Sequence, residues 1–87
     1  MEYYVKSVIS IIESNYHKLT SAEKTVADFF IENADAKDLS IKTVSERLFV
    51  SKASIVRFAK KCGFQGYKEF VYQYQQTFKQ KKEPITD

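Results

Sequence analysis

The sequence predicts an all-α fold, a bundle of five helices. Apolar residues recur every three or four positions along most of the chain, which is the spacing of one helix face, and the two-residue alternation of a strand is weak. The 87 residues include only two Gly and one Pro, so few positions interrupt a helix. Hydrophobic residues make up 44% of the chain. A chain of this length forms one domain with a small core.

The first two helices are predicted at residues 2–15 and 21–33. The second follows Thr20-Ser21-Ala22-Glu23, a capping box in which Thr20 and Glu23 satisfy each other's free backbone N–H groups. The core-facing positions are Val5, Val8, Ile9 and Ile12 in the first helix and Ala22, Val26, Phe29 and Phe30 in the second. Residues 33–38 are polar and form the connection to the third helix.

The last three helices are predicted at residues 41–48, 52–62 and 67–81. Ser40 and Ser51 are the N-caps of the first two of them. Gly63 is placed to end the helix at 62 in a left-handed conformation, with Phe64 folding back onto that helix. The inward positions of the last helix are Tyr67, Phe70, Val71, Tyr74 and Phe78.

Residues 41–63 have the pattern of a helix-turn-helix, in which two short helices cross steeply around a tight turn. Ser45 is small where the two helices approach most closely, and Val50 is placed to fill the corner in the turn. The core-facing positions are Val44 and Leu48 before the turn and Ile55, Phe58, Ala59 and Cys62 after it. In this motif the second helix lies in the DNA major groove.

The other side of helix 52–62 is basic. This helix contains four Lys or Arg residues and no acid. At about 100° per residue, Ala53, Arg57 and Lys60 point away from the core. Arg57 suits the O6 and N7 atoms of guanine, and the lysines suit phosphates. The predicted DNA-binding residues are Ser51, Lys52, Ala53, Ser54, Arg57, Lys60 and Lys61.

The charge is unevenly distributed along the chain. Residues 1–39 hold four Lys and seven acids, a net charge of 4 − 7 = −3, and residues 40–87 hold ten Lys or Arg and four acids, a net charge of 10 − 4 = +6. A basic half favours a polyanionic partner. The same charge is also compatible with a helical protein-interaction module that docks its basic helix on an acidic partner. Gly63-Phe64-Gln65-Gly66 leaves RNA binding as a third reading, although a GxxG loop needs strands that the sequence does not predict.

Other features exclude several classes of protein. The chain lacks a catalytic Ser/His/Asp set and a glycine-rich phosphate loop, so we expect no enzyme, and His17 has no neighbour with which to bind a metal. No cofactor is expected. The lone Cys62 cannot form an internal disulfide, continues a core stripe and is expected to be buried and inert. No apolar run approaches the roughly 18 residues of a membrane span, and we expect a cytoplasmic protein.

Some apolar residues exceed what one core contact needs. They are Tyr4, Val8 and Ile11 in the first helix and Tyr72 in the last. They are compatible with a loose core or with a homodimer through the first helix, which would help two recognition helices reach half-sites spaced by the DNA turn.

With these residues in place, the chain resembles the N-terminal domain of the RpiR family of bacterial transcription regulators. The family's opening pattern is matched by residues 19–29, LTSAEKTVADF. Its Val-Ser-x-Ala-Thr-Val-Val-Arg-Phe signature is similar to residues 50–58, VSKASIVRF. Its Gly-Phe-x-Gly-Phe/Tyr-x-Glu-Phe segment is matched by residues 62–70, CGFQGYKEF. The family often has Gly where Phe49 stands and Ala where Ser45 stands. A Phe with positive φ would cost about 1 kcal/mol, so either the turn is tuned differently or packing of Phe49 offsets that energy.

The resemblance implies a function and a second domain. It implies sequence-specific binding to double-stranded DNA by residues 1–82, as part of a transcription regulator of sugar or sugar-phosphate metabolism genes. Family members carry a C-terminal sugar-isomerase-type domain that binds a phosphosugar effector and controls DNA affinity. Residues 83–87 are then expected to be a tail or the start of a linker to that domain, which these residues do not include.

Overall fold

The computed structural model describes residues 7–32 and 38–82, with side chains as far as residue 76. Within these ranges it contains helices α1 Val8–Asn15, α2 Ser21–Glu32, α3 Ile41–Leu48, α4 Lys52–Lys61 and α5 Tyr67–Lys82, and a short 3-10 turn, η2 Tyr16–Lys18. No strand occurs in them. The predicted all-α, five-helix fold is therefore confirmed. The predicted positions Tyr4 and Val5, and the side chain of Phe78, lie outside the described residues.

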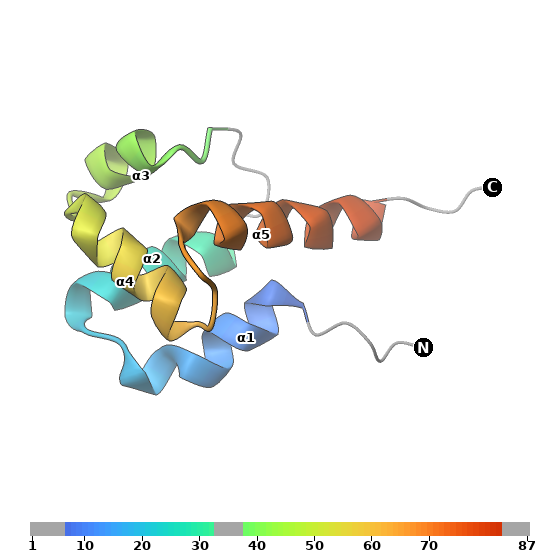
Figure 1. The fold of residues 1–87 in the computed structure, drawn as a ribbon, viewed down its shortest axis with the longest axis horizontal. Coiled ribbons are helices and arrows are strands. Elements are labelled where there is room, and N and C mark those ends of the chain that lie inside the picture. The colour runs from blue at the N-terminus through green and yellow to red at the C-terminus, as the bar shows by residue number, and fades with distance from the viewer. Residues whose placement is uncertain (1–6, 33–37, 83–87) are drawn as a thin grey trace.

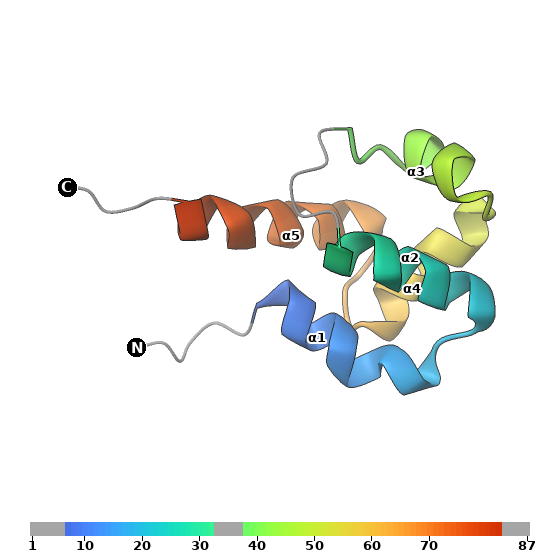
Figure 2. The same cartoon turned by 180° about the vertical axis from the view of Figure 1, so that it is seen from behind.

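Helix α4 is at the centre of the packing. It contacts α2, α3 and α5, while α1 contacts α2 and α5. Figure 1 shows α3 and α4 together at one end of the molecule, with α5 extending away from them. In Figure 2, the view from the opposite side, α2 lies in front of α4. Three helices thus cover one side of α4 and hold it in place.

The core is rich in aromatic rings. Phe30 is fully buried, and its ring centroid lies 4.8 Å from that of Phe70 and 4.9 Å from that of Tyr74, both edge-on. Two buried hydroxyls on α5 also bond to backbone carbonyls: Tyr74 Oη donates to Phe30 O and Tyr67 Oη to Leu39 O, each at 2.7 Å. These bonds tie α5 to the end of α2 and to the segment before α3.

Helix α1 is shorter in the described residues than predicted, but its core contacts agree with the prediction. Val8 and Ile12 are buried, and Ile9 and Ile11 are half-buried against the core. Val8 therefore belongs to the core and does not add to an exposed apolar face. Tyr72 of α5, by contrast, is exposed as expected.

The predicted capping box of α2 and the predicted left-handed end after α4 are confirmed in detail. Thr20 N donates to Glu23 Oε1 at 3.0 Å and Glu23 N to Thr20 Oγ1 at 3.2 Å, which is the reciprocal capping box. Gly63 has φ 97°, and Phe64 N donates to Ala59 O at 3.1 Å, the bond that closes a left-handed helix end. The chain then turns directly into α5.

Helix α3 ends in the same way, but without a glycine. Phe49 has φ 57° and ψ 44°, and Val50 N donates to Ser45 O at 3.2 Å. The Phe49 side chain is 93% exposed, so packing, one of the two alternatives that the sequence left open, does not offset the cost of this conformation. The helix-turn-helix keeps the left-handed turn and carries its strain.

We expect Phe49→Gly to raise the free energy of unfolding by roughly 0.5–1 kcal/mol. Removing Cβ relieves about 1–2 kcal/mol of left-handed strain, and the greater freedom of glycine in the unfolded chain offsets part of it. Urea unfolding followed by circular dichroism measures the change. Phe49→Ala keeps Cβ and should leave the stability near that of the wild type. Equal stability of the two variants would contradict strain as the cause.

Candidate nucleic-acid interface

The turn between α3 and α4 is held by hydrogen bonds from small polar side chains. Ser45 Oγ donates to Val50 O at 2.6 Å, on the same residue whose N–H returns to Ser45 O. Ser51 Oγ accepts from Ser54 N at 3.1 Å and caps α4, as predicted. The first turn of α4 is thereby fixed relative to α3.

The side of α4 that the core does not use is exposed and basic. Ile55, Phe58, Ala59 and Cys62 are all buried, which confirms the predicted core side of this helix. The opposite side has no acid and includes the exposed residues Ser51, Lys52, Ala53, Arg57 and Lys60. A helix N-terminus with free N–H groups next to cations favours an anion.

Two predicted site residues, Ser54 and Lys61, lie differently from the other five. Ser54 is buried, and its Oγ accepts hydrogen bonds from Ser51 Oγ at 3.0 Å and from Arg57 Nη2 at 3.3 Å. Lys61 is half-buried, and its Nζ donates to Glu23 Oε1 at 2.8 Å and to Lys18 O at 3.3 Å. Both side chains lie on the flank of α4 that faces α2.

Glu23 joins this surface from α2, and the sequence did not predict it there. Its side chain is 0% exposed, and its Oε2 accepts from Arg57 Nε at 3.4 Å. Burial alone would raise the pKa of this carboxyl, but hydrogen bonds from Lys61 Nζ and Thr20 N outweigh it and hold the pKa below its ordinary value. Glu23 is therefore ionised at neutral pH and shared between two cations.

Other titratable residues have structural roles. Asp38 Oδ1 accepts from Ser40 N and its Oδ2 from Thr43 Oγ1, both at 3.0 Å. These bonds, the one from the Ser40 backbone first, lower the pKa of Asp38, which thus supports the start of α3. Burial raises the pKa of the Cys62 thiol to about 11, so the thiol stays protonated.

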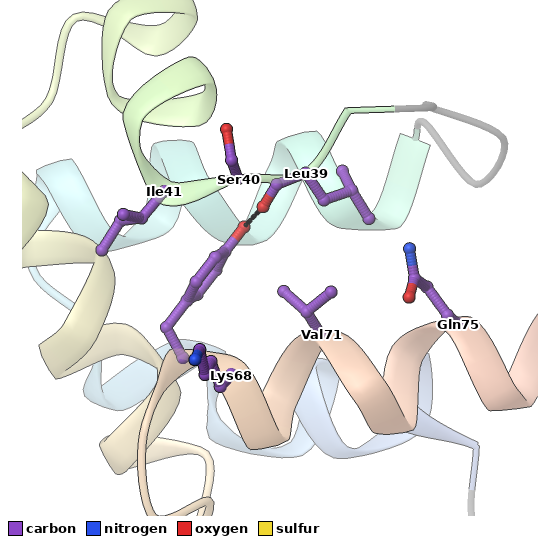
Figure 3. Close-up of a pocket in the computed structure, with 7 residues that line it drawn as sticks. Leu39, Ser40, Ile41, Lys68, Val71 and Gln75 are labelled. Carbon is purple, nitrogen blue, oxygen red and sulfur yellow. Dashed lines mark hydrogen bonds between the residues drawn. The ribbon is translucent and has the colours of Figure 1, made fainter.

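A pocket lies apart from α4, between the start of α3 and α5. It has a volume of about 430 Å³, and it is lined by Leu39, Ser40, Ile41, Tyr67, Lys68, Val71 and Gln75. Figure 3 shows the α5 side chains below and residues 39–41 above, with the hydrogen bond from Tyr67 between them. None of the predicted DNA-binding residues contributes to it.

The described residues contain no group of three or more His, Cys, Asp or Glu side chains placed to hold a metal ion. No helix among them is long and apolar enough to cross a membrane.

The curated relatives of this chain are described as HTH-type regulators, which agrees with the helix-turn-helix arrangement of α3 and α4. The chain is 35% identical over 65 residues to an uncharacterized HTH-type transcriptional regulator of Haemophilus influenzae, covering 74% of this chain and 23% of the relative. A similarly described regulator of Thermotoga maritima is 39% identical over 67 residues, 72% of this chain and 23% of that protein. A third, from Escherichia coli, is 33% identical over 57 residues, 64% of this chain and 20% of that protein. The chain thus spans less than a quarter of the length of these curated relatives.

The family comparison covers most of the described structure. Residues 6–81 match the model of the helix-turn-helix domain of the rpiR family, a range that covers α1 to α4 and all of α5 except its last residue, Lys82. The resemblance found in the sequence is thereby confirmed, and the chain belongs to the RpiR family of helix-turn-helix domains.

Proposed function

We propose that this chain binds double-stranded DNA sequence-specifically, as the N-terminal domain of a transcription regulator, with α4 in the major groove. The observation that supports this most is the contrast between the two sides of α4. One side is fixed by α2, α3 and α5, and the other is exposed and basic, with no acid from α4 itself. The proposal assigns no catalytic step to the chain.

Each exposed residue has a role in this proposal. Ser51 and the N-terminal N–H groups of α4 bind a phosphate, and Lys52 and Lys60 neutralise others. Ala53 is short enough to let a base approach and to touch a thymine methyl group. Arg57 donates two bonds to the O6 and N7 atoms of a guanine. Ser54 and Lys61 contribute from the flank of α4 that faces α2, where Ser54 bonds to Arg57 and Lys61 bonds to Glu23.

The finer parts of the proposal rest on the family resemblance. They are control of sugar or sugar-phosphate metabolism genes in the cytoplasm, and regulation by a phosphosugar that binds to a C-terminal domain. A homodimer through α1 also remains a proposal. Of its predicted positions in the first helix, only half-buried Ile11 is available, because Val8 is in the core and Tyr4 lies outside the described residues.

Selection of bound sequences from random duplex DNA tests the proposal. We expect one preferred sequence, and a two-fold symmetric one would also support the homodimer. If no duplex is enriched and the chain binds an acidic polypeptide as tightly as DNA, the alternative of a protein-interaction module on an acidic partner is correct.

Lys60→Ala is expected to weaken binding to all duplexes alike. Loss of one phosphate contact should reduce the slope of log affinity against log salt by about 1. Fluorescence anisotropy at several salt concentrations measures the slope. Lys68→Ala is the matched control, because Lys68 is an exposed lysine on α5 beside the pocket (Figure 3). An equal change of slope in both variants would exclude a specific role for Lys60.

A further inference from the structure

We propose that Glu23 of α2 is a positioning residue for DNA recognition, which orients Arg57 and Lys61 of α4 before the duplex arrives. This inference rests on the proposed function. It assigns a role in recognition to a residue outside the helix-turn-helix, in the capping box that begins α2.

The first support is the set of bonds around the carboxylate. Oε1 accepts from Thr20 N at 3.0 Å and from Lys61 Nζ at 2.8 Å, and Oε2 accepts from Arg57 Nε at 3.4 Å. The side chain is fully buried and held by its own helix end, so it has little freedom to move. The cations of α4 therefore pack against a fixed anion.

The second support is the edge of the Arg57 guanidinium that these bonds use. Nε and Nη2 share one edge of the planar group, and they bond to Glu23 Oε2 and Ser54 Oγ. Among the residues that the structure describes, none accepts from Nη1. The end formed by Nη1 and the second proton of Nη2 remains available, and the side chain is 58% exposed. Two parallel N–H groups at this end are what a bidentate contact with guanine needs.

The third support is the charge balance of the cluster. One carboxylate shared by Arg57 and Lys61 leaves a net positive charge for the phosphates. Glu23 therefore lowers the attraction to any duplex slightly while it fixes the direction of Arg57. Loss of its charge should raise general affinity and lower base discrimination, and a residue with a purely structural role would not produce these opposite changes.

Glu23→Gln tests this inference, because glutamine is isosteric and also serves in capping boxes. Discrimination is measured as the ratio of affinities for the duplex selected from the random pool and for the same duplex with the Arg57-dependent base pair replaced. We expect the ratio to fall about 10-fold, with unchanged or about 2-fold higher affinity for an unrelated duplex. Glu13→Gln makes the same charge change at an exposed site on α1 and should leave the ratio unchanged.

The Arg57→Ala background separates this inference from the proposed function. If Arg57 reads a base and Glu23 positions it, Glu23→Gln should cause no further loss of discrimination in Arg57→Ala. If Arg57→Ala loses discrimination but Glu23→Gln keeps it, the inference is wrong and the proposed function stands. If no duplex is selected, or if Arg57→Ala discriminates as well as the wild type, the assigned role of Arg57 is wrong.

A measurement on the wild-type chain does not depend on the stability of any variant. The Nε–H proton of Arg57 should exchange with water more slowly than that of Arg47, which lies over the Phe29 ring with its guanidinium carbon 5.5 Å from the ring centroid. Nuclear magnetic resonance of the two arginine Nε–H signals decides this. Equal exchange rates would show that Glu23 does not hold Arg57 in solution and would overturn the inference.

Discussion

Phe30→Ala is expected to lower the free energy of unfolding by about 3–5 kcal/mol, the usual loss for a buried phenylalanine. Phe30 is 0% exposed and lies among aromatic rings of α2, α4 and α5. Besides its edge-on contacts with Phe70 and Tyr74, it stacks on Phe58 with centroids 6.2 Å apart. Alanine would leave a cavity that none of these rings can fill without leaving its own contacts. Domains of this size are stable by only about 5–15 kcal/mol, so this variant is expected to be close to unfolding.

Urea unfolding followed by circular dichroism measures this loss. Phe49→Ala is the matched control, because it removes the same atoms from a residue that is 93% exposed. It should change the stability by less than about 0.5 kcal/mol. A loss of less than about 1 kcal/mol in Phe30→Ala would show that the aromatic cluster repacks around the cavity or does not form the core.

The helices and their ends were predictable because their signals are local. Serine caps at 40 and 51, the capping box at Thr20 and the glycine at 63 each act within a few residues, and each is confirmed. The core side of α4 followed from spacing alone, since Ile55, Phe58 and Ala59 recur at one face. The conformation of Phe49 could not be predicted in the same way, because the sequence did not show whether packing offsets its strain. The exposure of its side chain in the structure excludes packing.

The pairing across the site could not be read from local patterns. Glu23 and Arg57 are 34 positions apart in the chain, and the capping box already accounts for a glutamate at position 23. Ser54 is among the predicted DNA-binding residues, yet it lies four residues before Phe58 and is buried on the flank of the core side. Ser54, Arg57 and Lys61 follow the spacing i, i+3, i+7, and this spacing was the available sign that they share the α2 flank.

Arg57→Ala is expected to weaken binding to the selected duplex by about 1–3 kcal/mol and to relax the preference at one base pair. This variant loses two interactions: the attraction between the Arg57 charge and the DNA phosphates, and the two parallel hydrogen bonds to one base edge. Arg57→Lys separates them, because lysine keeps the charge but cannot donate two parallel bonds. Lysine should restore the salt dependence of the wild type without restoring the base preference.

Repeated selection from random duplex DNA with each variant, together with anisotropy at fixed salt, measures both losses. The structure makes the lysine variant informative. Glu23 Oε2 and Ser54 Oγ, which accept from Arg57, can also accept from a lysine Nζ, but lysine has no pair of parallel N–H groups to offer the base. Lys60→Ala serves as the comparison, with a loss that is uniform over sequences. If Arg57→Lys keeps the full preference, Arg57 acts as a point charge on a phosphate. The bases would then be contacted by the first turn of α4, where Ser51 and Ala53 are exposed.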